Sequence, residues 1–226
     1  MAVAPYILAD EKPSKCLTDK GYLPTIVSGR VLWHLGDSAS KSAAAFTASY
    51  GMFQRAALAH EPSYQVRGAL TDGFDSSTVS RMRTLFPGTR LGSCLRHALN
   101  KLPAKLLGVS AAVRQELRSQ FHTLLHRCRP CTSLRVVALG QRLRHFADRI
   151  TTTVSAAPGE RVRGWFKAKK AGWYAVLEDP KMPAMSTVVD QAHHAMDRKL
   201  FAMKKGCTIP AGVKPRCSPV WHTATT

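Results

Sequence analysis

An α/β fold with a mixed five-stranded sheet is the architecture that the sequence predicts, and three observations predict it. Short apolar runs, rich in β-branched and aromatic residues, follow one another closely between residues 6 and 35. Two segments with helical periodicity then alternate with two more short apolar runs, up to about residue 94. Helical periodicity dominates the rest of the chain. We therefore expect three consecutive strands, then helix, strand, helix and strand.

The first three strands are expected at Tyr6–Asp10, Tyr22–Val27 and Val31–Leu35. Ser28-Gly29 is a turn signal, so the second and third strands should be antiparallel neighbours. The stretch between the first two is punctuated by Pro, Lys and Gly and is expected to connect them. Pro24 has no backbone N–H to donate, which predicts an edge position or a bulge for the second strand.

The next elements alternate between helix and strand. A helix is expected over Lys41–His60, and its apolar face should pack on the sheet; the residues on that face are Phe46, Tyr50, Phe53 and Ala57. Gln65–Leu70 is expected to be a fourth strand that leads into Asp72, and a second helix should cover Ser76–Phe86. Thr89–Cys94 is the fifth strand. This order is that of an RNase H-like mixed sheet rather than a doubly wound Rossmann sheet, and it makes the first and fourth strands neighbours.

Helices should also form most of the second half of the chain. Leu99–Ile150 keeps helical spacing, Thr151–Glu160 is expected to be a loop because it contains Pro158-Gly159, and a final helix should span Ser186–Lys205. Beyond Gly206 the chain is rich in Pro and Gly, so residues 207–226 are expected to form a poorly ordered tail.

The charge points to a nucleic-acid partner. The chain has 33 Lys and Arg against 14 Asp and Glu, a formal net charge of +19. Residues 81–181 alone hold 20 basic and 5 acidic residues. Such a surplus commonly attracts a polyanion, although a merely basic, soluble surface explains charge alone about equally well. A secretory signal and a long apolar span are both lacking, so no membrane partner and a cytoplasmic location are expected.

Three acids are the candidate catalytic residues. Asp10 and Asp72 end neighbouring strands, and Asp190 lies in the first turn of the last helix. In-line attack on a phosphodiester by two divalent metals needs carboxylates that converge from separate elements. Each acid also has a structural interpretation: a turn residue at Asp10, an Asp-Gly turn at Asp72 and a helix-capping position at Asp190. Their joint placement favours the catalytic interpretation.

Several motifs resemble those of insertion-sequence transposases of the Mutator-like DDE type. They are Ile7-Leu-Ala-Asp10-Glu11-Lys12, Leu70-Thr-Asp72-Gly73-Phe74 followed by Phe86-Pro87, Cys94-Leu-Arg-His97, and Ser186-Thr-Val-Val-Asp190. The resemblance covers most of residues 6–206, and it implies a first part of the core at residues 1–98, a mainly helical basic insertion at 99–182 and a closing catalytic helix at 183–206. It implies that Asp10, Asp72 and Asp190 bind two Mg²⁺ or Mn²⁺ ions for DNA strand cleavage and transfer. The third acid of this family is usually Glu, so Glu178 is a rival for Asp190.

The same resemblance implies partners and a cellular setting. The substrates would be the ends of a mobile element and its target DNA, and a homo-oligomer would be the active form, associated with a bacterial nucleoid. Members usually carry an N-terminal domain that recognises the element's ends. Nine residues precede Asp10, so a truncated or split reading frame is expected.

Supporting roles are assigned to residues around the three acids. The resemblance implies that Cys94 and His97 lie close to the active site. As a zinc half-site they could instead pair with Cys128 and Cys131. His194, with His193 and Asp197, is expected to support the closing helix through hydrogen bonds or to be solvated. The residues expected to contact DNA lie beside the aromatic residues Trp165, Phe166, Trp173 and Tyr174 and are Arg161, Arg163, Lys167, Lys169 and Lys170. The alternative is that two of these four aromatic residues are buried in the core.

Two other functions compete with the transposase core. One is a basic nucleic-acid-binding remnant of such an enzyme that no longer cleaves DNA. The other is an RNase H-like or resolvase-like nuclease, which shares the acids but leaves Cys94, His97 and the basic insertion unexplained. Cleavage assays with an Asp72→Asn variant distinguish these possibilities.

Overall fold

The fold was analysed in a computed structural model that describes residues 4–16, 19–29, 31–40, 42–72, 76–126 and 133–204. The chain divides into two compact units, residues 1–192 and 193–226. The first unit holds the sheet, six helices and the start of the seventh, α7 (Thr187–Lys204). The described part of the second unit is the remainder of α7. The predicted tail, residues 207–226, lies outside the described residues.

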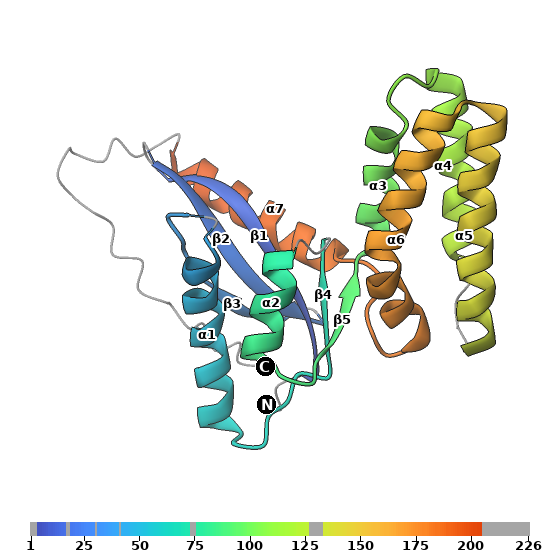
Figure 1. Cartoon of the computed structure of the whole chain (residues 1–226). Helices are drawn as coiled ribbons and strands as arrows, with labels where there is room; N and C mark the ends of the chain where they lie inside the picture. The colour runs from blue at the N-terminus through green and yellow to red at the C-terminus, as the bar shows by residue number, and fades with distance from the viewer. Residues whose placement is uncertain are drawn as a thin grey trace. The chain divides into compact units, whose positions relative to one another are not determined.

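A five-stranded mixed sheet forms the centre of the first unit, as predicted (Figure 1). Its order is β3-β2-β1-β4-β5. β1 pairs with β2 and β2 with β3 in antiparallel fashion, whereas β1 with β4 and β4 with β5 are parallel. The strands are β1 (Tyr6–Cys16), β2 (Asp19–Ser28), β3 (Val31–Leu35), β4 (Gly68–Thr71) and β5 (Arg90–Ser93).

The β1–β2 hairpin is longer than the sequence predicts. Pairing continues past Asp10↔Thr25 to Cys16↔Asp19, through the segment that we expected to be a connection. Pro24 lies in β2, which is an inner strand, and its carbonyl accepts a hydrogen bond from the Gly36 N–H at 2.9 Å. The register with β3 shifts between Ile26 and Val27, so the bulge alternative, and not the edge position, describes this strand.

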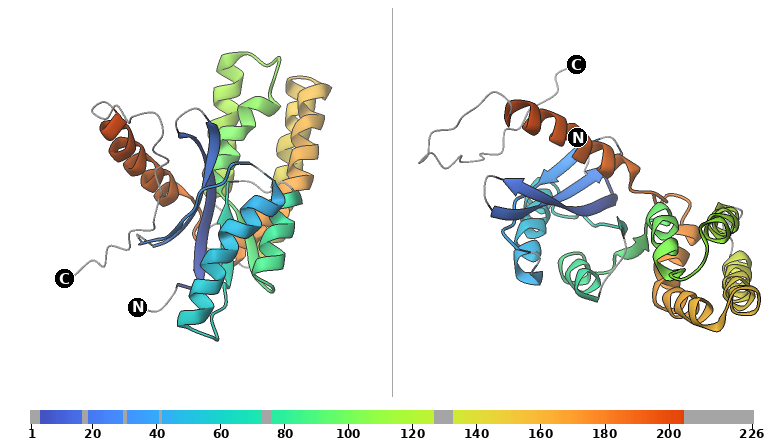
Figure 2. Two further views of the ribbon diagram at one scale, coloured as in Figure 1. Left: turned by 90° about the vertical axis from the view of Figure 1, so that its left-hand side faces the viewer. Right: turned by 90° about the horizontal axis from the view of Figure 1, so that it is seen from above.

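Helices α1 (Ala43–His60) and α2 (Ser76–Leu85) cover one face of the sheet (Figure 2). Ser42 starts α1, because its hydroxyl accepts a hydrogen bond from the Ala45 N–H at 3.1 Å. The apolar face predicted for this helix is buried and packs with alternate β1 residues such as Ile7 and Ala9. Successive strand residues face opposite sides, so Leu8 faces the other way.

The opposite face shares one core with the helical region and with the start of α7. Leu8 and Leu70 from the strands pack in the same cluster as Val189. Figure 1 shows the helices of this region grouped beside β5. They are α3 (Leu95–Lys105), α4 (Ala111–His126), α5 (Ser133–Thr153) and α6 (Ala156–Glu178). The expected helical character of this region is confirmed.

The expected loop at Thr151–Glu160 is wrong, because α5 runs to Thr153 and α6 begins at Ala156. Pro158 is the third residue of α6, where backbone N–H groups have no partner inside the helix, so its missing donor removes no hydrogen bond. Gly159 lies against α5: an added Cβ would be 2.9 Å from the Thr151 Cα. The glycine thus allows a close approach of two helices.

The aromatic residues of α6 belong mainly to the core. Trp165, Phe166 and Trp173 are buried and contact Phe121 of α4. Only Tyr174 of the four is partly exposed. The interpretation of these residues as an aromatic DNA-facing surface is therefore wrong for three of them, since α6 turns this face towards α4 and α5 and away from solvent.

None of the helices in the described residues is long and apolar enough to cross a membrane.

Candidate active site

Asp10 and Asp72 lie near the end of the parallel pairing between β1 and β4, but Asp10 is inside β1, not at its end as predicted, and Asp72 is the first residue after β4. β1 and β4 pair through Leu8↔Leu70, and each aspartate follows two residues later in its own strand direction. Asp72 follows the end of β4, and its charge acts on the Asp10 carboxyl. Because side chains alternate along β1, Asp10 faces the same side of the sheet as Leu8 and Leu70. This is the face on which the start of α7 packs.

Asp190 approaches this face from α7. Ser186 precedes the helix, and its carbonyl accepts from the N–H groups of Val189 (2.9 Å) and Asp190 (3.1 Å), which closes the first turn. Val189 is buried in the core that contains Leu8. The negative charge of Asp190 acts on the Asp10 carboxyl. The fold therefore brings the three predicted acids to one region of the first unit.

Glu178 lies at the other end of the parallel strands. Its carboxylate is 3.5 Å from the guanidinium of Arg90, the first residue of β5. Its neighbour Asp179 accepts a hydrogen bond of 2.9 Å from Tyr6, the first residue of β1. Asp10 and Asp72 are instead near the carboxyl ends of the parallel pairing. This position favours Asp190 over Glu178 as the third acid.

Asp10 is held in an environment that opposes its ionisation. Burial raises the pKa of Asp10 from 3.8 to about 6, and the charge of Asp72 and, less strongly, that of Asp190 act in the same direction. The Glu11 N–H donates to the Asp10 carboxylate at 2.9 Å, and His97 lies close enough to lower the pKa; these two effects only partly offset the rise. A positive charge beside Asp10 would therefore lower its pKa and favour its ionised form.

Asp72 already has a cation beside it. The ammonium of Lys101, on α3, is 3.5 Å from the Asp72 Oδ2 and 3.3 Å from its carbonyl oxygen. Both side chains are more than a third exposed, so this pair is a weak, solvent-screened one. A ligand cation at Asp72 would compete with Lys101.

A cysteine, a histidine and a serine form a second polar group beside the acids. The Cys94 sulfur accepts hydrogen bonds from the Ser186 N–H (3.3 Å) and hydroxyl (3.4 Å), and the Ser186 hydroxyl is 3.2 Å from the His97 Nδ1. Burial acts to raise the pKa of Cys94, but hydrogen bonds from His97 and Ser186 lower it to about 7. The bond to Cys94 raises the pKa of His97, and Asp72 and Asp190 add to that rise.

Ser186 was not predicted to take part in this group. Its position before a helix indicates only a capping role. In the structure it links α7, which carries Asp190, to Cys94 at the start of α3.

Glu11 and Tyr50 are further residues that the sequence interpretation missed. On the opposite face of β1, the Tyr50 hydroxyl donates to the Glu11 carboxylate at 2.9 Å and lies 3.2 Å from the Asp10 carbonyl oxygen. Tyr50 is fully buried on α1. These bonds fix the β1 backbone at Asp10, and only the spacing of Tyr50 on the apolar face of the helix hinted at such a contact.

The donor chemistry of the three acids fits a divalent cation of the Mg²⁺ type, which prefers carboxylate oxygens. The mutual repulsion that raises the Asp10 pKa is the electrostatic condition that a cation would relieve. Within the described part of the chain, however, no three His, Cys, Asp or Glu side chains are gathered closely enough to hold one ion. The acids are thus neighbours that interact through charge, and not a closed ligand set.

The residues predicted to contact DNA differ in what they bind. Arg161 donates to the carbonyl oxygens of Lys105 (3.1 Å) and Leu107 (2.7 Å), and so it stabilises the end of α3. Arg163 pairs with Asp148 at 2.7 Å and with Glu160. Lys167 and Lys170 are exposed on α6, and Lys169 on the same helix is partly buried.

The expected supporting role of the α7 histidines and the zinc alternative involve residues outside the described part of the first unit. His193, His194 and Asp197 continue α7 in the second unit. Cys128 and Cys131, the partners in the zinc alternative, lie outside the described residues.

Comparisons with protein-family profiles, with curated proteins and with solved structures find no match for this chain.

Proposed function

We propose that the chain is the catalytic core of a DDE-type transposase, which cleaves and joins DNA strands with two divalent metal ions. The observation that carries this proposal is the placement of Asp10 and Asp72 two residues beyond the last parallel pair of β1 and β4, with the charge of Asp190 acting on Asp10. The order and directions of the strands are consistent with an RNase H-like layout. The motifs that resemble Mutator-like transposases contain the same three acids.

The proposed chemistry assigns each residue a task. Mg²⁺ or Mn²⁺, when bound, would supply charge neutralisation of the phosphate and a lower pKa for an attacking water or 3′-hydroxyl. Asp10, Asp72 and Asp190 would hold the ions, and a bound cation would favour the ionised form of Asp10, whose pKa is raised to about 6 in its absence. Tyr50 holds the backbone of Asp10, and Ser186 holds the start of α7.

DNA would be held by the basic helical region. Lys167, Lys169, Lys170 and Arg163 project from one helix, and phosphate contacts of this kind supply affinity with little sequence information. Element ends and target DNA are the proposed substrates, and a homo-oligomer is the proposed active form.

The test is a nicking and strand-transfer assay on DNA with Mg²⁺ or Mn²⁺, comparing the wild type with Asp72→Asn. Asp37→Asn is the matched control, because Asp37 is an exposed acid in the segment after β3. We expect metal-dependent cleavage by the wild type and the control and none by Asp72→Asn. Equal cleavage by all three proteins would contradict the proposal.

A non-catalytic DNA-binding protein is the second candidate. The net charge of +19 and the ion pair between Lys101 and Asp72 favour it, since neither requires a metal. DNA binding by all three proteins with cleavage by none would select this candidate. An RNase H-like nuclease would cleave without joining strands, so the strand-transfer half of the assay separates it.

A further inference from the structure

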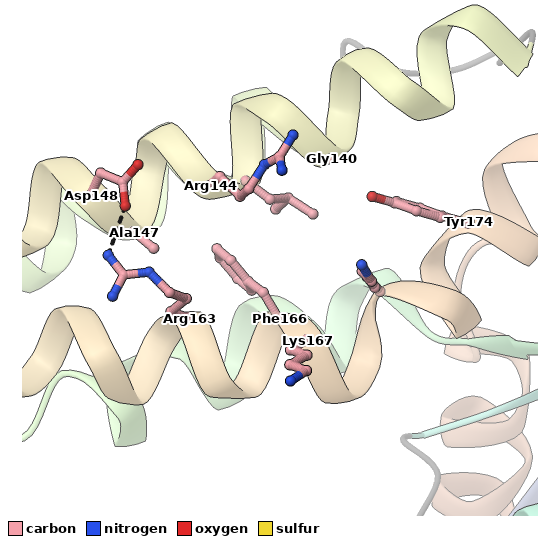
Figure 3. A pocket seen from close by; sticks show the side chains of 10 residues that line it. Gly140, Arg144, Ala147, Asp148, Arg163, Phe166, Lys167 and Tyr174 are labelled. Atoms are coloured by element: carbon pink, nitrogen blue, oxygen red, sulfur yellow. Dashed lines mark hydrogen bonds and ion pairs between the residues drawn. The ribbon is translucent and has the colours of Figure 1, made fainter.

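The helix pair α5 and α6 forms a pocket whose apolar part has no role in the proposed function, although Arg163, Lys167 and Lys170 at its edge are among the proposed DNA contacts. It has a volume of about 450 Å³, and buried Leu143, Ala147 and Phe166 line it together with exposed basic residues. In Figure 3 the Phe166 ring and the Tyr174 hydroxyl project into the space between the two helices. The volume lies within the range of pockets that hold small ligands.

Gly140 on α5 makes room at one end of this pocket. A Cβ at this position would lie 2.6 Å from the Tyr174 hydroxyl oxygen. Because Gly140 has no side chain, the Tyr174 hydroxyl can approach the α5 backbone while Tyr174 lines the pocket. Burial raises the pKa of Tyr174, so the hydroxyl remains a neutral hydrogen-bonding group.

The mouth of the pocket carries an excess of positive charge. Asp148 is the single acid among the lining residues, and it is paired with Arg163 at 2.7 Å. Across the part of the chain that the structure describes, Arg144, Lys167 and Lys170 have no carboxylate within ion-pair distance. Three cations thus surround an apolar floor.

This combination selects a ligand with two parts, a flat apolar ring and an anion. A nucleotide has both, because its base can lie against Phe166 while its phosphate meets Lys167 and Lys170. In a duplex the base is stacked and paired, so only an unpaired base can enter. We propose that the pocket binds one unpaired nucleotide of a single DNA strand.

The inference rests on the proposed function only in taking DNA as the polymer, because it requires no cleavage. It can therefore be tested by binding alone. Binding of unpaired DNA in this pocket without cleavage would support the pocket proposal and contradict the catalytic one. Cleavage without base-dependent binding would support the catalytic proposal and contradict the pocket one.

The test measures fluorescence anisotropy with a labelled oligothymidylate and with an abasic strand of equal length. We expect the wild type to bind the intact strand about tenfold more tightly, because stacking of a base contributes on that order. Lys167→Gln with Lys170→Gln should weaken binding and lower the slope of log K against log salt by about 1.4, at roughly 0.7 for each lost contact with a single strand. Arg55→Gln with Arg83→Gln, at exposed positions of α1 and α2, is the control with the same charge change.

A Gly140→Val variant tests the apolar part of the pocket. It should displace Tyr174 and abolish the preference for the intact strand over the abasic one, with unchanged near-ultraviolet circular dichroism of the buried tryptophans as evidence of folding. Thymidine monophosphate should displace the labelled oligothymidylate only weakly. Full displacement by an equal concentration of the mononucleotide would show that the ligand is a free nucleotide and not a DNA strand, and would overturn the proposal. Equal binding of intact and abasic strands, or equal effects of the pocket and control substitutions, would overturn it as well.

Discussion

The region of Asp10, Asp72 and Asp190 is acidic, whereas the pocket between α5 and α6 is basic. At the sheet, Asp10 ionises reluctantly because burial and two other acids oppose its charge. At the pocket, Arg144, Lys167 and Lys170 surround apolar side chains without acids to balance them in the described chain. The exposed Lys101–Asp72 pair leaves the Asp10 pKa raised, and the three cations of the pocket have no acid partner in the described chain. This contrast is the basis on which we propose a cation for the first region and an anionic nucleotide for the second.

Replacement of the third acid should have the largest effect on the acidic region. Asp190→Asn should reduce DNA cleavage by about three orders of magnitude, since a lost metal ligand removes several kcal/mol of transition-state stabilisation. Glu178→Gln is the matched comparison, because Glu178 pairs with Arg90 at the far end of the strands. Single-turnover cleavage rates measure both. A greater loss in Glu178→Gln would assign the role to the rival acid.

Stability should respond to Asp10 in the sense opposite to an ordinary ion pair. The pKa of Asp10 is raised in the folded state, so its contribution to stability is fully present below about pH 4 and is lost as the pH rises through about 6. Asp10→Asn should therefore be more stable than the wild type at pH 7, by about 2 to 3 kcal/mol. Urea unfolding at pH 7 and at pH 3.5 checks this. An equal difference at both pH values would contradict the account.

The group around Cys94 should respond to the loss of one hydroxyl. Ser186→Ala removes a hydrogen bond to the sulfur, so the pKa of Cys94 should rise above its value of about 7. We expect a loss of stability of about 1 kcal/mol. Thiolate absorbance against pH, taken as the difference from a Cys94→Ala variant, measures the pKa. An unchanged pKa would show that the Ser186 hydroxyl has no such role.

The smallest effect is expected for the cation beside Asp72. Lys101→Met should increase the affinity for Mn²⁺ by a factor of about two to five, because an exposed ion pair contributes no more than about 1 kcal/mol. Calorimetric titration with Mn²⁺ measures this factor. Weaker binding in the variant would show that Lys101 supports the site and does not compete for it.

The sequence predicts the parts of this fold that depend on local periodicity. The apolar run at the start of β1 and the spacing of Phe46, Tyr50 and Phe53 on α1 identify buried residues. The order of the elements makes β1 and β4 neighbours, as the structure shows. The buried residues follow from the pattern of one element at a time, whereas the adjacency of the two strands was predicted from the order of all the elements. The element that carries Asp190 is likewise found from its own pattern.

Features that depend on contacts between distant segments could not be predicted from the sequence. The bond from Ser186 to Cys94 joins residues 92 positions apart, and Ser before a helix has a sufficient local explanation. Pro and Gly in sequence are typical of turns, which is why a loop was predicted at Pro158-Gly159. In the structure both residues lie inside α6, where Gly159 allows a close contact with α5. Whether Trp165 faces solvent or the core depends on α4, which no pattern within α6 reveals.

The pKa of Asp10 is the quantity that tests the central claim most directly. Carboxyl-carbon NMR titration, with Asp10→Asn used to assign the resonance, should give about 6 in the wild type. It should fall towards 3.8 in Asp72→Asn and, by a smaller amount, in Asp190→Asn, because each variant removes a neighbouring negative charge. A pKa that stays the same in both variants would mean that the three acids do not share one region, and the account of a common site would be contradicted.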